Sequence, residues 1–196
     1  MARTDRRMDV TNTALPGVLR LTPRRFGDAR GYFCETWNAR RMAEAGLDVA
    51  FVQDNESYSE ESGTVRGLHY QRPPHAQGKL VRAVAGAILD VAVDVRRGSP
   101  TFGRWVSEEL SAQNGAMLWV PRGFLHGFVT LEPRTQVAYK VDGHYAPDCD
   151  GSVRFDDPDL AIEWRVDSAA VVLSDKDAAA PAFKDFETPF VYEGAP

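Results

Sequence analysis

The chain lacks the features that mark several classes of protein. Only two of its 196 residues are cysteine, Cys34 and Cys149, and they form no CxxC pair and no disulfide framework, which fits a reducing cytoplasm. The longest apolar run, residues 83–89, has seven residues, whereas a membrane-spanning helix needs about 20. The charged first nine residues are followed by no apolar stretch, so we do not expect them to act as a signal peptide. We therefore expect a cytoplasmic protein with no membrane partner.

The chain also lacks an excess of positive charge. The formal net charge is −5, so the chain offers no basic surface for phosphate backbones and we expect no nucleic-acid partner. Only four of the 23 basic residues are lysine: Lys79, Lys140, Lys176 and Lys184. An ammonium group is a compact charge that a guanidinium cannot replace at a tight site. The few lysines are therefore candidates for specific roles.

Glycine-rich phosphate loops are missing as well. The sequence contains neither GxxxxGK[ST] nor GxGxxG, the two patterns in which backbone N–H groups cradle phosphates. A nucleotide or sugar phosphate would therefore be held by arginine side chains. Arg30, Arg66 and Arg82 are candidates, although for any one arginine a surface position is the commoner case.

The chain is long and apolar enough, with 43% hydrophobic residues, for one compact domain. We expect a flexible leader over residues 1–13, a single domain over 14–183 and an irregular tail over 184–196. Two short helices are expected near residues 38–45 and 174–180, where Asn38 and Ser174 can act as N-caps. A turn is expected around Asp28 and Gly31.

Short β-rich runs separated by turn signals dominate the middle of the chain. This spacing, without intervening helices, predicts an all-β fold, an antiparallel sandwich or barrel. The expected strands cover residues 17–22, 50–53, 64–70, 79–84, 87–95, 101–110, 116–120, 124–131 and 135–141.

The run 87–95 alternates strictly, with Val91, Val93 and Val95 on one face and Asp90, Ala92 and Asp94 on the other. The polar face could be solvated, as is common in antiparallel sheets, or it could line a ligand cavity inside a barrel. Alternation alone does not choose between the two.

Histidine is rare, with four residues in the chain. His126 ends the pattern Gly-x5-Pro-x-Gly-x2-His (residues 115–126), which resembles the second motif of cupin barrels. His69 stands in the region of the first motif, but it lacks the second histidine of the HxH pair found in metal-dependent cupins. His69, His126 and a carboxylate such as Asp90 could still bind a metal, but the missing histidine makes this the minority interpretation, and no metal site is predicted.

A set of motifs in the same order along residues 14–183 resembles the dTDP-4-dehydrorhamnose 3,5-epimerase family. The family's enzymes are homodimeric, cofactor-free jelly rolls of the cupin type, so the resemblance implies an isomerase with this fold, a dTDP-sugar substrate and no cofactor. The motifs are FGDARGYF (26–33), FVQDN (51–55), RGLHYQ (66–71), GKLVR (78–82), SPTFG (99–103), WVPRGFLHGF (119–128), YK (139–140) and LSDKD (173–177).

The implied reaction inverts C3 and C5 of dTDP-4-dehydro-6-deoxy-D-glucose, as a step of dTDP-L-rhamnose biosynthesis. Both carbons are α to the C4 ketone, so loss of either proton gives an enolate, which needs a base, an acid on the opposite face and a donor or cation at O4. By resemblance His69 is the base, Asp177 orients it, Lys79 lies at O4 and Tyr139 is the acid.

The resemblance also assigns substrate contacts. Phe26, Arg30 and Glu35 belong to the early motif, and Arg30 and Glu35 are expected to reach the nucleotide of the partner subunit. Tyr145 corresponds to the ring that stacks on thymine, although the tyrosine that often precedes it in the family is His144 here. The remaining expected contacts are Gln53, Asn55, Arg66, Asp90, His126, Asp150, which stands where the family usually has glutamate, and Lys176.

Three alternatives remain open at the level of sequence. The chain could epimerise only C3 or only C5 of a related sugar, it could be a metal-dependent cupin enzyme, or it could be a non-catalytic sugar-nucleotide-binding cupin. Retention of both His69 and Tyr139 argues against the last.

Overall fold

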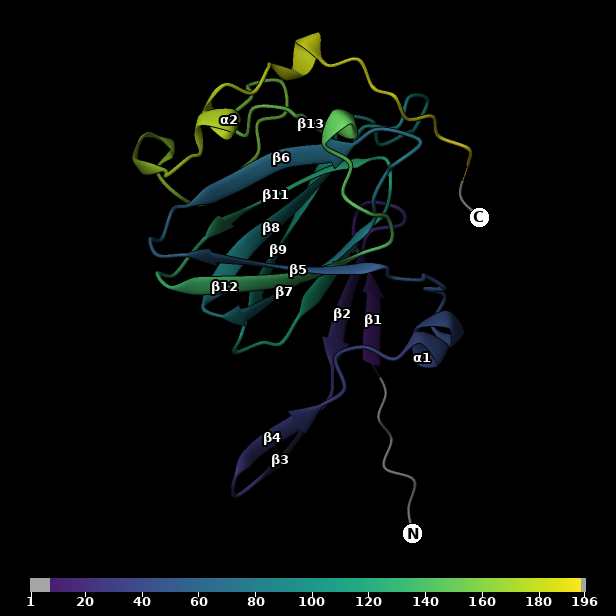
Figure 1. Cartoon of the computed structure of the whole chain (residues 1–196), viewed down its shortest axis with the longest axis vertical. Coiled ribbons are helices and arrows are strands. Elements are labelled where there is room, and N and C mark those ends of the chain that lie inside the picture. The colour runs from purple at the N-terminus through teal and green to yellow at the C-terminus, as the bar shows by residue number, and fades with distance from the viewer. Residues whose placement is uncertain (1–7, 195–196) are drawn as a thin grey trace.

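The computed structural model describes residues 8–194, which form two antiparallel sheets packed face to face (Figure 1). The first sheet has the order β1 (Met8–Asn12), β2 (Leu19–Pro23), β10 (Met117–Val120), β7 (Lys79–Ala85), β12 (Thr135–Val141) and β5 (Gln53–Ser59). The second has the order β13 (Asp150–Ser152), β6 (Val65–Gln71), β11 (Phe124–Thr130), β8 (Ala87–Asp94) and β9 (Trp105–Ser111). The predicted all-β antiparallel jelly roll is confirmed.

The space between the two sheets is filled by the inward-facing side chains of both. Val81, Leu118 and Val137 of the first sheet meet Ile88 and Phe124 of the second, and all of them are buried. Burial of a large aliphatic or aromatic side chain contributes about 1.5–3 kcal/mol. This core holds the sheets together at one end of the sandwich and leaves the polar inward-facing residues at the other end to line a cavity.

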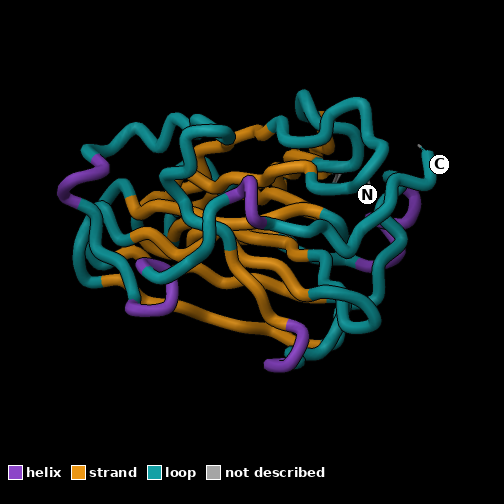
Figure 2. Tube along the Cα trace, turned by 90° about the horizontal axis from the view of Figure 1, so that it is seen from above, coloured by secondary structure: helices purple, strands orange, loops and turns teal. Residues whose placement is uncertain are grey.

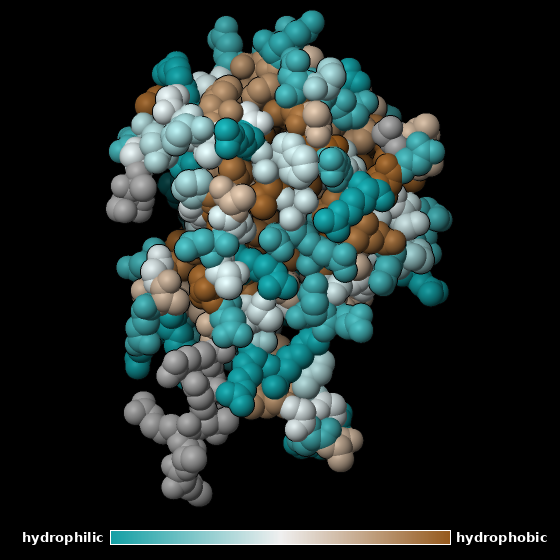
Figure 3. All heavy atoms as spheres, turned by 180° about the vertical axis from the view of Figure 1, so that it is seen from behind, coloured by the Kyte–Doolittle hydropathy of each residue, from teal (hydrophilic) through white to brown (hydrophobic). Residues whose placement is uncertain are grey.

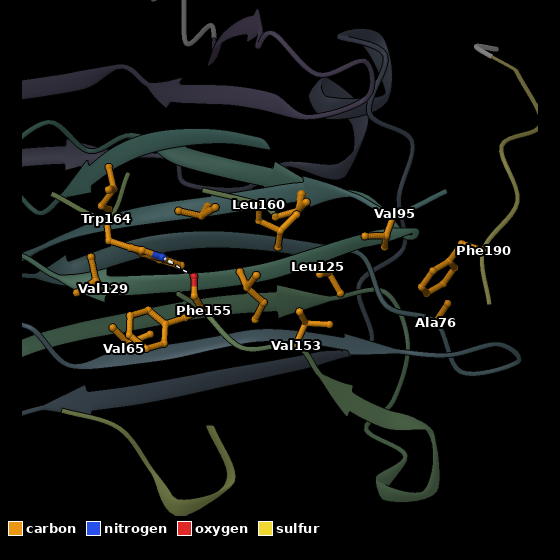
Figure 4. Packing of buried hydrophobic residues seen from close by; sticks show 14 residues of the cluster. Val65, Ala76, Val95, Leu125, Val129, Val153, Phe155, Leu160, Trp164 and Phe190 are labelled. Carbon is orange, nitrogen blue, oxygen red and sulfur yellow. Dashed lines mark hydrogen bonds between the residues drawn. The ribbon is translucent and has the colours of Figure 1, made fainter. Parts of the chain in front are cut away.

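All eight residues of β8 are buried, which decides the question that its alternation left open. Val91 and Val93 belong to a buried cluster that also contains Phe155 and Trp164 of the chain after β13. Within this cluster the Nε1–H of Trp164 donates to the Phe155 carbonyl at 2.8 Å (Figure 4). Asp90 lies on the opposite face and is 0% exposed. Asp90 therefore faces the interior between the sheets, and the solvated face that the alternation also allowed is excluded.

Few helices are present, and they lie at the margins of the strand-rich body (Figure 2). Helix α1 (Ala39–Glu44) begins where predicted, since the Asn38 side chain accepts from the N–H of Arg41, and its Met42 packs on Leu80 and Trp119 of the first sheet. Helix α2 (Asp175–Ala178) is capped by Ser174, as predicted. The 3-10 turns are η1 (Pro147–Cys149), η2 (Ser168–Ala170) and η3 (Phe183–Asp185). Within residues 8–194 no helix is long and apolar enough to span a bilayer.

A hairpin of β3 (Arg25–Asp28) and β4 (Gly31–Cys34) stands away from the body, with the predicted turn at its tip (Figures 1 and 3). Tyr32 and Phe33 on this hairpin are each 59% exposed. Exposed aromatic side chains gathered on a projecting element are a common sign of a protein-binding surface.

The structure differs from the sequence prediction mainly near the chain ends. Residues 8–12, assigned above to the leader, form β1, because Met8 and Val10 pack on the cluster beneath α1; residues 1–7 lie outside the described part. The strand expected at 50–53 begins only at Gln53, and the strand expected at 101–110 begins at Trp105. The irregular tail folds back on the body, where Phe190 is buried against the second sheet.

Candidate active site

A cavity with two adjoining lobes opens between the sheets, at the end where β5 and β6 face each other. His69, Lys79, Tyr139 and Lys176 line both lobes. The first, here the histidine lobe, has a volume of about 400 Å³ and adds Ser57, Arg66, His126, Phe128, Leu173 and Asp177. The second, here the tyrosine lobe, has about 380 Å³ and adds Gln53, Asn55, Gln71, Gln77, Tyr145 and Asp150.

Another cavity, of about 360 Å³, lies against outward-facing side chains of the first sheet, among them Asp54, Arg82 and Lys140. It contains neither His69 nor Lys79. The chemistry-bearing side chains therefore gather in the two lobes between the sheets.

Two histidines stand opposite each other on neighbouring strands of the second sheet. His69 of β6 pairs in register with His126 of β11, and the register shifts just after this pair. Gly67 makes the close approach possible: a Cβ on it would lie 2.5 Å from the Cα of Gly127, and its φ of +134° also favours glycine. Both imidazoles consequently face the cavity from the same wall.

His69 is held by a carboxylate that comes from the far end of the chain. Its Nε2 lies 2.5 Å from Oδ1 of Asp177, which is 5% exposed on α2. Burial acts to raise the pKa of the Asp177 carboxyl, but the hydrogen bond and charge of His69 outweigh it and hold that pKa below its usual range. Asp177 is therefore an anion that fixes the orientation of the imidazole, as the carboxylate of a catalytic triad does for its histidine base.

His126 has its own aspartate. Its Nε2 lies 2.8 Å from Oδ1 of Asp90, and both side chains are almost completely enclosed. Burial lowers the pKa of His126, while the neighbouring Asp90 acts in the opposite direction. Asp90 lies behind His126 and not in the lining of either lobe, and its Oδ2 has no hydrogen-bond partner among the described residues.

Lys79, the first residue of β7, faces the histidines from the other sheet. Burial lowers the pKa of Lys79 to about 8. The negative charges of Asp90 and Asp150 act to raise this pKa, and the positive charge of Lys176 lowers it slightly further. At neutral pH the side chain is therefore mostly an ammonium ion. A poorly solvated ammonium is well suited to stabilise negative charge that develops on a bound oxygen.

Tyr139 of β12 lies on the same sheet as Lys79, with Asn55 of β5 and Val81 of β7 beside it in register. Burial raises the pKa of its phenol, partly offset by the charge of Arg66. The phenol is therefore protonated at neutral pH. Since His69 belongs to the opposite sheet, the cavity lies between a proton acceptor on one wall and a proton donor on the other.

The tyrosine lobe carries polar and aromatic groups around its rim. Tyr145 is 58% exposed, its N–H donates to Oε1 of Gln53, and its hydroxyl lies 3.4 Å from Asp150. Asp150 also forms an ion pair with Lys176. The side chain of Asn55 accepts a hydrogen bond of 2.8 Å from that of Gln53.

Most of the residues predicted for the site meet in these two lobes. Asp90 lies behind His126 and lines neither lobe, and three further residues, Phe26, Arg30 and Glu35, lie away from the cavity. Phe26 and Arg30 belong to the projecting hairpin, where the Arg30 guanidinium is 90% exposed and bound to Asp28. Glu35 follows the hairpin and accepts a hydrogen bond of 2.8 Å from Arg41. None of the three lines the cavity of its own chain.

Several lining residues were missed from the sequence, notably Ser57, Gln71, Gln77 and Phe128. Period-two alternation could have found two of them. Ser57 continues the face of β5 that carries Gln53 and Asn55, and Gln71 follows His69 by two residues on β6. Within residues 8–194 the structure holds no group of three or more His, Cys, Asp or Glu side chains placed to bind a metal ion.

A His–Asp pair, a lysine and a tyrosine around one cavity of a jelly roll fit an enzyme that removes and returns protons beside a carbonyl group. The family model for dTDP-4-dehydrorhamnose 3,5-epimerase matches residues 12–185, and the chain belongs to this family. A dTDP-4-dehydrorhamnose 3,5-epimerase of Sinorhizobium fredii is 51% identical over 172 residues, 88% of each chain.

Solved structures agree with this membership. An epimerase of Legionella pneumophila in complex with dTDP-4-keto-L-rhamnose is 42% identical, with a TM-score of 0.91 over 96% of this chain and 100% of the other. ChmJ, a 3'-monoepimerase of Streptomyces bikiniensis in complex with dTDP-quinovose, is 36% identical, with a TM-score of 0.81 over 87% of this chain and 85% of the other.

Proposed function

We propose that the chain epimerises dTDP-4-dehydro-6-deoxy-D-glucose at C3 and C5, to give dTDP-4-dehydro-L-rhamnose, with His69 as base and Tyr139 as acid. The observation that carries this proposal is the pairing of His69 with Asp177 on one wall of a cavity whose other wall presents Lys79 and Tyr139. Family membership supports the same reaction.

The chemistry needs no redox step. His69 takes the proton from C3 or C5, and the electron pair of the broken C–H bond forms a C=C bond as the C4 carbonyl becomes an enolate. The ammonium of Lys79 donates to the developing charge on O4, where one such donor typically contributes about 10²–10³ in rate. The Tyr139 phenol then delivers a proton to the other face of the same carbon, which restores the ketone with inverted configuration. His69 and Tyr139 return to their starting states by exchange of protons with water.

Substrate binding divides between the lobes. In this proposal the sugar occupies the histidine lobe, beside His126, and the thymine ring stacks on Tyr145 at the rim of the tyrosine lobe. Gln53, Asn55, Arg66, Asp150 and Lys176 contact the sugar, the diphosphate and the nucleoside between these points. The cationic groups of Arg66 and Lys176 suit the diphosphate.

We further propose that the active unit is a homodimer in which the hairpin of one subunit completes the site of the other. The 90% exposed Arg30 and the exposed Tyr32 and Phe33 support this, because such side chains on a projecting hairpin gain most when covered by a second subunit. Phe26 and Glu35 would enter the neighbouring site with Arg30. A cytoplasmic location is part of the same proposal, supported by the free thiols of Cys34 and Cys149.

Inversion at C3 alone is the second candidate, favoured by the similarity to a 3'-monoepimerase. The two candidates differ in the product and in the isotope pattern. Purified protein is incubated with dTDP-4-dehydro-6-deoxyglucose in D₂O and followed by proton NMR. The proposal expects deuterium at both C3 and C5 and the L-rhamno product. Deuterium confined to C3, with retained configuration at C5, would establish the monoepimerase. A requirement for stoichiometric iron, manganese or zinc would instead support a metal-dependent cupin.

A further inference from the structure

The loop that presents Tyr145 is fixed by glutamine side chains from the cavity wall. The loop follows β12 and covers residues 143–146, between Asp142 and η1. Three glutamines, here called the glutamine clamp, reach it: Gln53 of β5, Gln71 of β6 and Gln77, which lies between β6 and β7. All three line the tyrosine lobe.

Gln71 makes the largest number of these bonds. It is 5% exposed, and its Nε2 donates to the carbonyl of His75 at 2.6 Å and to that of His144 at 3.2 Å, while its Oε1 accepts from the N–H of Ala146 at 2.8 Å. One buried amide thus holds the backbone on both sides of Tyr145. A buried amide group keeps its place only when its donors and acceptor are satisfied.

The other two members act on the remaining backbone groups. Gln77 Nε2 donates to the carbonyl of Gly143 at 2.6 Å, and Gln53 Oε1 accepts from the N–H of Tyr145 itself at 3.2 Å. Four consecutive loop residues therefore each have one backbone group bound by a glutamine side chain. Because loop backbone is otherwise mobile, such anchoring removes conformational entropy before a ligand arrives.

We propose that the glutamine clamp pre-organises Tyr145 as a platform for the thymine base, so that Gln71 and Gln77 are positioning residues for nucleotide affinity and not for the proton transfers. This rests on the proposed function, in which Tyr145 stacks on thymine. Tyr145 is 58% exposed, and within residues 8–194 its hydroxyl makes one long hydrogen bond, of 3.4 Å, to Asp150. The hydrogen bonds between the glutamines and the loop backbone therefore determine the position of Tyr145. Gln71 also lies two residues from His69 on the same strand, so the clamp fixes the distance between the base and the platform.

The experiment measures the dissociation constant of dTDP by calorimetry and kcat and KM by coupled assay. The variants are Gln71→Met, Gln77→Met, Tyr145→Ala and the double variant Gln71→Met/Tyr145→Ala. Methionine keeps the length of the side chain and removes its hydrogen bonds. Gln136→Met, at the far end of β12, is the matched control and should leave all constants unchanged. Gln77→Met, which loses one loop bond, serves if Gln71→Met does not fold.

The proposal expects Gln71→Met to weaken dTDP binding and raise KM about five- to tenfold, as loss of about one hydrogen bond's free energy would do, with kcat at saturation within about twofold. In the Tyr145→Ala background the same substitution should have no further effect on dTDP binding, because the platform is already gone. Equal weakening in both backgrounds, or a fall in kcat without a rise in KM, would overturn the clamp. Unchanged dTDP binding in Tyr145→Ala would overturn the proposed stacking of thymine on Tyr145. Failure of the proposed function can therefore be distinguished from failure of the clamp alone.

Discussion

His69 and His126 stand opposite each other on adjacent strands, and each is hydrogen-bonded to an aspartate, yet their surroundings differ. Asp177 beside His69 comes from the C-terminal segment and closes one side of the cavity, while Asp90 beside His126 is buried between the sheets. Burial lowers the pKa of His126, which favours a neutral ring that orients substrate. The side chain of His69 is only partly buried, and its partner Asp177 is ionised because its pKa is lowered. His69 is therefore the histidine placed to accept a proton from a ligand.

Replacement of Lys79 tests the stabilisation of the enolate. Lys79→Ala should lower kcat about 10²–10³-fold, the usual cost of one donor at a developing oxyanion, and should change the affinity for dTDP itself little. Lys140→Ala is the matched control, because Lys140 lies on β12 but pairs with Asp54 outside the two lobes. A rate for Lys79→Ala equal to that of the control would remove Lys79 from the mechanism.

The pH dependence follows from the same lysine. An ammonium group is charged below its pKa, so the oxyanion donor is present at neutral pH and is lost as the pH rises through about 8, the pKa of Lys79. Ionisation of Tyr139 does not cause a loss of activity in this pH range, because burial raises the pKa of its phenol. We expect kcat/KM to fall above about pH 8. A profile that stays flat to pH 10 would show that the charge of Lys79 is not required.

Asp90 should determine the pH at which kcat/KM falls on the basic side of the profile. Its charge raises the pKa of Lys79 against burial, so Asp90→Asn should move the basic limb of kcat/KM to lower pH, with some loss of activity from the weakened hold on His126. The pH profile of the variant measures this directly. A limb that stays in place, or moves to higher pH, would mean that the two groups do not interact.

Mixed dimers test whether the hairpin acts on the neighbouring site. Arg30→Ala and His69→Ala subunits are both expected to be poorly active alone. If Arg30 serves the partner's site, a mixed dimer has one site with both wild-type residues, and random exchange should restore about a quarter of wild-type activity. If each chain supplied Arg30 to its own cavity, no site in the mixture would be complete and activity would stay at the level of the two variants.

Much of this architecture can be predicted from local patterns, because strand alternation and helix caps depend on near neighbours. The strand of Asp90 and the N-caps Asn38 and Ser174 are examples. The catalytic set was predicted from the resemblance to a family and not from spacing. Asp177 lies 108 residues from His69, and no periodicity connects the two.

The parts that local patterns missed depend on tertiary contacts. The sequence did not determine whether Asp90 faces water or the interior, because its burial depends on the first sheet, which packs on that face of β8. β1 forms because it pairs with the edge of β2. Gln71 contacts the loop that carries Tyr145 because that loop, about 75 residues further along the chain, folds back onto β6. Glutamine carries no motif of its own, so the clamp has no counterpart in the sequence.

The division of labour between His69 and Tyr139 is the central claim, and deuterium exchange set against epimerisation tests it most directly. His69→Ala should give neither product nor deuterium uptake at C3 or C5 in D₂O, because no enolate forms without the base. Tyr139→Phe keeps the base, so an enolate can form and be reprotonated by His69 on the original face. That variant should therefore take up deuterium while inversion, above all at C5, is impaired. Equal loss of exchange and inversion in Tyr139→Phe, or full inversion by it, would contradict the assignment of Tyr139 as the acid.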